Sequence, residues 1–217
     1  MSGNYGGNGY AWGGGTNGPH ISRYYSARGW IMPGETVIDA ACATGYGSYL
    51  LAQNAKKVIG LEVDASCVDE ANLRWPADNI EYRVLDLGKD ELPDADVLIS
   101  IETGEHVNGL DHFLDQMWKH ISRCVVFCVP IGGSSWDYTP EQLLTPAGEN
   151  NDFMNDQEVI AMFMDRGWNL QWHNSIGYSS IFIFYKKPPK MPKGYDENGF
   201  PEGHRDHILA LEALKNE

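Results

Sequence analysis

The sequence TVIDAACATGYGSYLLA at residues 36–52 decides the fold class. Residues 36–40 form a short apolar run that is typical of a buried strand, and residues 45–55 continue as a helix that starts on glycines. Small residues occupy the turn between them, so the backbone can approach a ligand and the free N–H groups at the helix start can face it. The stretch therefore predicts a strand, a ligand-binding turn and a helix.

Strands and helices continue to alternate along the chain. We expect a helix before the first strand, at 20–31, and later helices at 65–75, 109–121 and 156–168. We expect further strands at 57–63, 79–87, 94–101, 124–129, 168–173 and 179–187. The last two strands have only a turn at Ile176-Gly177 between them, so they can pair only as an antiparallel hairpin. This alternation, with fully apolar central strands, predicts an α/β fold with a mostly parallel sheet and helices on both faces.

The length and charge of the chain limit its domain count and its partners. The chain has 217 residues, which suits one ordinary domain. The 16 Lys and Arg residues against 30 Asp and Glu residues give a net charge of −14. This charge disfavours a protein that binds nucleic acid or an anionic membrane through general electrostatics. We expect a flexible glycine-rich arm at 1–19, the main domain at 20–187, and a tail containing prolines and glycines at 188–217.

Cysteine usage and targeting signals favour a cytoplasmic protein. The N-terminal stretch has no basic region followed by an apolar run, so no signal peptide is expected. No run approaches the ~20 apolar residues that a membrane span needs. The four cysteines form no C-x-x-C pair, and we expect them to be reduced thiols: Cys42, Cys67, Cys124 and Cys128. The sequence carries no signal for the oligomeric state.

Acidic residues close three successive predicted strands, at Asp39, Glu62 and Asp86. The carboxyl ends of parallel strands form the ligand-binding edge of such a sheet. A carboxylate at Glu62 can accept from both hydroxyls of a ribose, and one at Asp86 can accept from the amine of a base. No G-x-G-x-x-G motif is present, and Asp39 would repel a pyrophosphate but suit an ammonium or sulfonium. The pattern predicts an adenosine-containing ligand such as S-adenosylmethionine.

Four stretches resemble motifs I to IV of the class I S-adenosylmethionine-dependent methyltransferases. They are VIDAACATGYGSYLLA at 37–52, VIGLEVD at 58–64, YRVLDL at 82–87 and DVLISIETGEHV at 96–107. The resemblance covers roughly residues 20–187. It implies a Rossmann-like seven-stranded sheet of order 3-2-1-4-5-7-6 in which strand 7 is antiparallel, and it implies that the protein is an enzyme.

The resemblance implies residues for the methionine end of the cofactor. Ala41 and Gly45 would line this end, and Asp39 would support the ammonium group. Arg23 resembles an arginine that meets the methionine carboxylate in related enzymes. Ala41 and Ala43 depart from the family, which usually has glycine there, and their methyl groups could weaken cofactor binding. The alternative is a structural turn that binds no cofactor.

The resemblance also implies residues for the adenosine end. Glu62, beside Val63, would hold the ribose hydroxyls. Asp86, with Leu87, would recognise the adenine, and Ile101 would lie beside the cofactor.

The motif E-x-x-E-H, formed by Glu102, Glu105 and His106, is similar to one that binds a divalent metal in methyltransferases of quinone phenols and of RNA 3′-end ribose. Oxygen and nitrogen ligands suit Mg²⁺ or Mn²⁺, which would lower the pKa of an acceptor hydroxyl. Glu102 and Glu105 would share one side of a helical turn. Alternatively, the two carboxylates cap the next helix, or His106 acts as a general base with Glu105 nearby. Candidates for a further ligand are His20, His112 and His173.

The segment at 132–154 is long for a connection, rich in aromatic and acidic residues, and has no Lys or Arg. It is either an acceptor-binding loop or a solvated surface loop. We expect methyl transfer from S-adenosylmethionine to a hydroxyl or amine of a small acceptor rather than a polymer. The alternatives are an enzyme that cleaves the cofactor as a hydrolase or lyase, a partner protein that has lost catalysis, and a nucleic-acid methyltransferase.

Overall fold

The computed structural model describes residues 18–131, 155–176 and 179–187. Most of the predicted arm, the loop at 132–154 and the predicted tail therefore lie outside the described residues. Within the described part, no helix is both long enough and apolar enough to cross a membrane.

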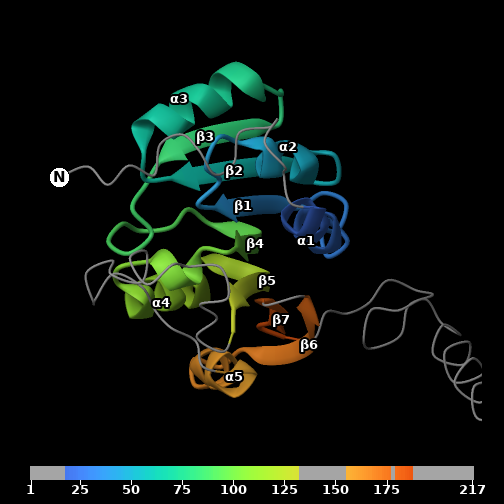
Figure 1. The fold of residues 1–217 in the computed structure, drawn as a ribbon, viewed down its shortest axis with the longest axis vertical. Helices are drawn as coiled ribbons and strands as arrows, with labels where there is room; N and C mark the ends of the chain where they lie inside the picture. Colours follow the sequence, from blue (N-terminus) through green and yellow to red (C-terminus); the bar gives the residue numbers. More distant parts are fainter. Residues whose placement is uncertain (1–17, 132–154, 177–178, 188–217) are drawn as a thin grey trace, which may run out of the picture.

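Seven strands form one sheet in the order β3-β2-β1-β4-β5-β7-β6 (Figure 1). The strands are β1 Thr36–Ala40, β2 Lys57–Glu62, β3 Ile80–Val84, β4 Ala95–Ile101, β5 Ile121–Pro130, β6 Asn169–Ile176 and β7 Ser179–Tyr185. All neighbouring pairs from β3 to β5 are parallel, whereas β7 is antiparallel to both β5 and β6. The predicted topology, including the final hairpin, is therefore confirmed.

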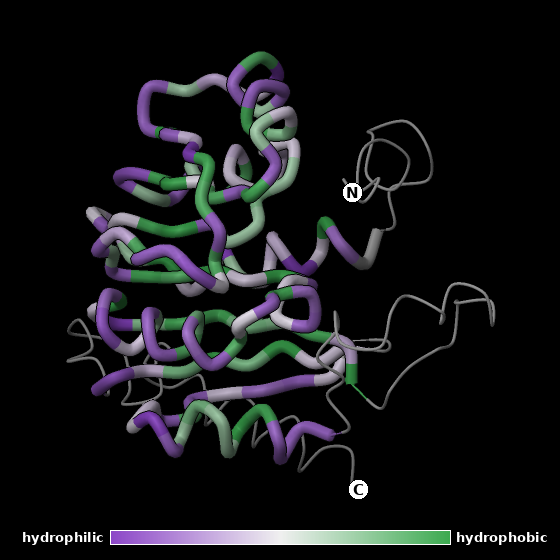
Figure 2. The backbone as a smooth tube through the Cα atoms, turned by 90° about the vertical axis from the view of Figure 1, so that its left-hand side faces the viewer, coloured by the Kyte–Doolittle hydropathy of each residue, from purple (hydrophilic) through white to green (hydrophobic). Residues whose placement is uncertain are grey.

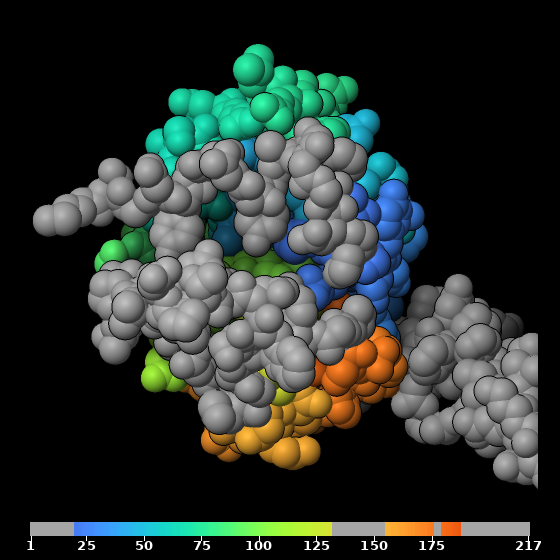
Figure 3. All heavy atoms as spheres, in the orientation of Figure 1, coloured from blue at the N-terminus to red at the C-terminus, as the bar shows by residue number. Residues whose placement is uncertain are grey.

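Helices cover both faces of the sheet, as predicted. They are α1 Gly18–Arg28, α2 Tyr46–Ala52, α3 Ala65–Arg74, α4 Leu110–His120 and α5 Asp156–Met164, with a short 3₁₀ helix, η1, at Gly104–His106. Side chains of α1 and α2 pack into one apolar cluster with the sheet, and side chains of α4 and α5 pack into a second cluster. The space-filling view shows α3 at one end of the molecule and α5 at the other (Figure 3).

The central strands are buried on both faces. In β4, Val97 and Ile99 face the cluster with α1 and α2, whereas Leu98 faces the cluster with α4 and α5. Hydrophobic residues, coloured green, accordingly follow one another along the central part of the backbone (Figure 2). Strands buried on both faces need apolar residues at every position, which is why continuous apolar runs identified them.

Several boundaries differ from the predicted ones. β5 begins directly after α4, at Ile121, rather than at residue 124. β3 ends at Val84 rather than at residue 87, because Asp86 accepts a hydrogen bond from the Gly88 amide at 3.0 Å and starts a turn there. α1 ends at Arg28, three residues earlier than predicted.

Candidate functional site

The order of the sheet reverses between β1 and β4. Ala40 at the end of β1 pairs with Ser100 in β4, and the Thr103 hydroxyl donates a hydrogen bond to the Ala40 carbonyl oxygen at 3.3 Å. Ligands of open α/β sheets bind at the carboxyl ends of the strands where the order reverses. We call this place the switch point; residues 41–45 border it after β1, and residues 102–106 border it after β4.

The turn after β1 is built from left-handed residues. Ala41, Ala43 and Gly45 have φ angles of 56°, 48° and 89°. A left-handed conformation costs an alanine about 1 kcal/mol, which is why glycine is common in such turns. At Gly45 a Cβ atom would lie only 2.7 Å from the Cβ of Ala71. The turn thus keeps a glycine-type shape although alanine occupies two of its positions.

Glu62 lies at the end of β2 and is held by backbone groups. Its Oε2 accepts from the Ala43 amide at 3.0 Å, and its Oε1 accepts from the amides of Val63 at 2.8 Å and Asp64 at 3.2 Å. A carboxylate has about four acceptor positions, so these bonds leave capacity for ligand hydroxyls. The Val63 side chain beside it is 63% exposed. The remaining acceptor positions of Glu62 fit the hydroxyls of a ribose in an adenosyl group.

Asp86 follows β3, and its charge already has a partner. Its Oδ1 accepts from the Gly88 amide at 3.0 Å, and its Oδ2 lies 2.5 Å from the Lys89 ammonium. Leu87 next to it is buried. Ile101, at the end of β4, is also buried.

Asp39 is fully buried and engaged by two helices. Its carboxylate accepts from the Ser48 hydroxyl of α2 at 2.6 Å and from the Tyr24 hydroxyl of α1 at 3.1 Å. Burial raises the pKa of this carboxyl from 3.8 to about 7. Asp39 therefore ties α1 and α2 to β1, with both oxygens in use.

Arg23 and Glu102 form an ion pair at the switch point. The Arg23 Nε lies 3.8 Å from the Glu102 Oε1, and the two side chains are 2% and 13% exposed. The Arg23 Nη2 donates to the Ser179 hydroxyl at the start of β7, at 3.1 Å. The Cys128 thiol donates to the Glu102 Oε1 at 3.4 Å. Sequence reasoning did not connect these four residues, because no periodic pattern relates them.

The predicted metal site at Glu102, Glu105 and His106 is not supported. Glu102 has a left-handed φ of 51° and precedes η1, so the two glutamates do not share a helical turn. Burial and the Glu102 carboxylate raise the pKa of Glu105 to about 8. Within the described part of the chain, no group of three or more His, Cys, Asp or Glu residues could hold a metal ion. The candidate further ligands contact other groups: His20 the Tyr46 hydroxyl, His112 the Asp90 carbonyl oxygen, and His173 the Asp156 carboxylate.

His106 is the exposed member of this motif. Its side chain is 46% exposed, and its Nε2 lies 3.8 Å from the Glu105 Oε1. The Glu105 Oε2 is buried, and among the described residues it has no hydrogen-bond partner. The two side chains are thus neighbours, one accessible to a ligand and one enclosed.

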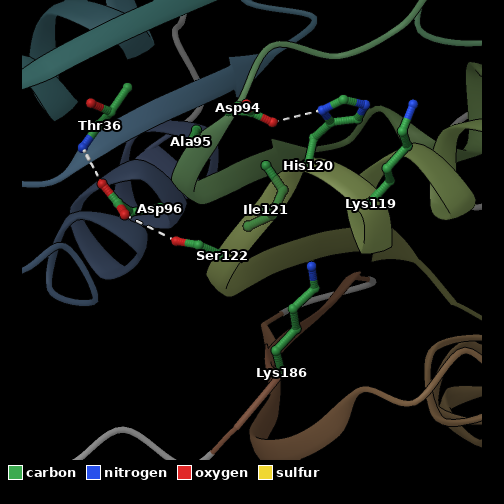
Figure 4. A pocket seen from close by; sticks show the side chains of 9 residues that line it. All are labelled: Thr36, Asp94, Ala95, Asp96, Lys119, His120, Ile121, Ser122 and Lys186. Atoms are coloured by element: carbon green, nitrogen blue, oxygen red, sulfur yellow. Dashed lines mark hydrogen bonds and ion pairs between the residues drawn. The ribbon is translucent and has the colours of Figure 1, made fainter.

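A pocket of about 410 Å³ lies at the opposite, amino edge of the sheet (Figure 4). Its lining residues are Thr36, Asp94, Ala95, Asp96, Lys119, His120, Ile121, Ser122 and Lys186. Asp96 accepts from the Thr36 amide at 2.9 Å and from the Ser122 hydroxyl at 3.0 Å, and His120 lies 2.8 Å from the Asp94 carboxylate. The polar groups of this pocket therefore hold strand ends together, and the pocket lies away from the switch point.

Comparisons with known proteins bear on the family and the fold. Residues 38–126 match the protein family described as "Methyltransferase domain". A Mycobacterium tuberculosis protein named as a probable S-adenosylmethionine-dependent methyltransferase is 34% identical over 141 residues, which are 61% of this chain and 48% of that protein. A similarly named Mycolicibacterium smegmatis protein is 33% identical over 98 residues, which are 44% of this chain and 37% of that protein. The chain thus spans less than half the length of these curated relatives.

A third relative and two solved structures extend the comparison. A Clostridium acetobutylicum protein named "Uncharacterized RNA methyltransferase" is 40% identical over 57 residues, which are 26% of this chain and 12% of that protein. Magnesium protoporphyrin IX methyltransferase from Synechocystis, solved with bound S-adenosylhomocysteine, has a TM-score of 0.65 at 18% identity, covering 78% of this chain and 84% of that one. The [4+2]-cyclase SpnF has a TM-score of 0.61 at 12% identity, covering 77% and 81%. The matched domain, the relatives and the sheet order together support a class I S-adenosylmethionine-dependent methyltransferase.

Proposed function

We propose that the protein transfers the methyl group of S-adenosylmethionine to a hydroxyl or amine of a small acceptor. The observation that carries this proposal is the Glu62 carboxylate, which three backbone amides hold at the end of β2, facing the left-handed turn at 41–45. One of these amides belongs to Ala43 in that turn, so the ribose acceptor and the turn are fixed relative to each other.

We assign the remaining cofactor contacts by position. Glu62 and Val63 would hold the ribose, and Asp86 and Leu87 would lie at the adenine. Ala41, Gly45, Ile101 and Arg23 would surround the methionine end. Because Asp39 is buried and bonded to two hydroxyls, its part in this arrangement is to hold α1 and α2 in place.

S-adenosylmethionine supplies an electrophilic methyl group on a sulfonium. The protein must place an acceptor in line with that group, and it needs a base only if the acceptor loses a proton early. His106 is the exposed candidate for that base, at the end of η1. Glu105 would support His106 as a neutral carboxyl, because its pKa is raised to about 8.

A small acceptor agrees better with the charge than a polyanion does. The chain carries a net charge of −14, which opposes binding along a phosphate backbone. The relatives that are named RNA methyltransferases match only 57 and 58 residues. Matches this short do not imply a shared acceptor.

Calorimetry with S-adenosylhomocysteine tests cofactor binding. We expect binding that does not change when EDTA replaces Mg²⁺, and we expect Glu62→Ala to weaken it at least tenfold through loss of the ribose contacts. Absence of binding at millimolar ligand would refute the proposal.

A second assay follows labelled methyl groups into panels of small phenols, alcohols and amines, with total RNA as the competing acceptor. We expect label in a small acceptor and loss of transfer in His106→Ala. Label in RNA alone would establish a nucleic-acid methyltransferase. Cofactor breakdown without an acceptor would establish a hydrolase or lyase, and binding without any turnover would establish a partner protein.

A further inference from the structure

Lys186 lies directly after β7 and lines the pocket at the amino edge of the sheet. Its side chain extends from the end of β7 towards the lining residues of α4 and β5 (Figure 4). The pocket has a volume of about 410 Å³, so a small reagent can enter beside the amino group of this lysine.

Lys119 and His120, the other basic residues of the pocket, each have an acidic partner. The Lys119 ammonium is paired with the Glu91 carboxylate. The His120 Nδ1 lies 2.8 Å from the Asp94 Oδ1. Within the described part of the chain, no carboxylate forms an ion pair with Lys186, and no acidic neighbour contributes to the pKa of its amine. The Lys186 charge is therefore not balanced by any described residue.

Two indole rings lie where a counter-ion would be expected. The Lys186 Nζ is 4.9 Å from the centre of the Trp118 ring and 5.7 Å from that of the Trp168 ring. The rings attract the cation through their faces, but they also keep water from one side of it. Burial accordingly lowers the pKa of the Lys186 amine from its usual value.

This environment favours a nucleophilic amine. An ammonium group has no lone pair and cannot attack a carbonyl carbon, so the reactivity of a lysine depends on its neutral fraction. Partial burial without a carboxylate partner increases that fraction at neutral pH. Lys186 combines this environment with a pocket beside its amino group, whereas Lys119 lines the same pocket but is paired with Glu91.

We propose that Lys186 is a site of N-acylation, at which the pocket admits small acyl phosphates to the amine. The nitrogen lone pair forms a bond to the carbonyl carbon, and the bond from that carbon to the phosphate oxygen breaks. Phosphate leaves with the electron pair of the broken bond, and the nitrogen loses one proton to water. The resulting amide is neutral, so the positive charge beside the two indole rings is removed. This inference does not depend on the proposed methyl transfer.

Acetyl phosphate is the probe, and tandem mass spectrometry locates the acetyl groups on individual lysines. Lys187 is the matched internal control, because it is the next residue along the chain and is exposed. At about pH 7.5 we expect Lys186 of the folded protein to be acetylated at least about threefold faster than Lys187. The ratio of the two rates should fall towards about one near pH 10, where both amines lose their protons. It should also be about one in urea-unfolded protein, where burial no longer distinguishes the two lysines.

A pair of variants tests the part of the indole rings. Trp118→Leu keeps an apolar side chain but removes one ring, so water should reach the ammonium and the ratio at neutral pH should fall. Trp75→Leu is the control, because Trp75 contacts Tyr49 in another part of the molecule, and it should leave the ratio unchanged. If Trp118→Leu does not fold, the comparison in the unmodified protein decides.

Two outcomes in the unmodified protein would overturn the inference. One is a rate for Lys186 that is equal to or below that of Lys187 in the folded chain. The other is a preference for Lys186 that does not change with pH, because accessibility alone would then explain the labelling. Neither outcome depends on binding of S-adenosylmethionine, so the proposed function is tested separately.

Discussion

Replacement of Asp39 by asparagine should change how stability depends on pH. Asp39 is fully buried, and burial raises the pKa of its carboxyl from 3.8 to about 7 in spite of hydrogen bonds from Ser48 and Tyr24. The folded state therefore holds a proton that the unfolded chain releases at pH 3.8. The free energy of unfolding accordingly falls as pH rises from about 4 to about 7, and then stays low.

The size of the effect follows from the two pKa values. At 1.36 kcal/mol for each unit of pKa, ionised Asp39 costs about 4 kcal/mol at pH 8. At pH 5 the same relation gives about 1.5 kcal/mol. Asparagine does not ionise, so the stability difference between the variant and the unmodified protein should shift by about 2.5 kcal/mol in favour of the variant between pH 5 and pH 8.

Urea denaturation at pH 5 and pH 8 measures this shift. Any pH-independent loss of stability caused by the asparagine side chain, such as a weaker hydrogen bond with Ser48, is the same at both pH values and cancels. The titration of Glu105, with its pKa of about 8, occurs in both proteins and also cancels. Glu81→Gln is the control, because hydrogen bonds from Arg83 and Lys57 lower the pKa of Glu81 to about 2, below the tested range. A shift below about 1 kcal/mol for Asp39→Asn would refute the reasoning.

Three further substitutions test the packing around the sheet. Gly47→Ala would place a Cβ atom 2.2 Å from the Tyr24 ring, so we expect α1 to be displaced and the free energy of unfolding to fall by about 1–3 kcal/mol in urea denaturation. Ala43→Gly should relieve the strain of the left-handed φ but increase the conformational entropy of the unfolded chain. We therefore expect the free energy of unfolding to change by less than about 0.5 kcal/mol, and calorimetry should show unaltered binding of S-adenosylhomocysteine. Arg123→Lys would lose the two-point contact with Glu35, and we expect thermal unfolding to show a loss of about 2 kcal/mol.

The sheet topology was predictable because it depends on local patterns. Continuous apolar runs such as residues 36–40 identified buried strands, and the missing helix before residues 179–187 required an antiparallel hairpin. Strand ends were less predictable. β5 begins at Ile121, before the apolar run at 124–129, because Ile121 pairs with Ala95 in β4. The start of this strand is therefore set by strand pairing and not by composition.

Contacts between distant segments could not be read from the sequence. Arg23 and Glu102 meet because α1 packs across the sheet, and no spacing rule encodes that packing angle. The E-x-x-E-H motif suggested one helical turn, but the left-handed Glu102 breaks it. At Gly104 a Cβ atom would lie 2.3 Å from the Phe127 ring, so η1 passes close to β5, and this contact too joins distant segments.

Three acidic residues at the ends of neighbouring strands acquire different chemistry from their hydrogen-bond donors. Glu62 is bonded to three rigid amides and keeps capacity for ligand hydroxyls. Asp39 is enclosed with two hydroxyls, and its pKa rises to about 7. Glu102 has an arginine and a thiol beside it and is only 13% exposed. Since all three count equally in the net charge of −14, the donors around each carboxylate, rather than the number of acids, decide how it is held and which acceptor positions it has left.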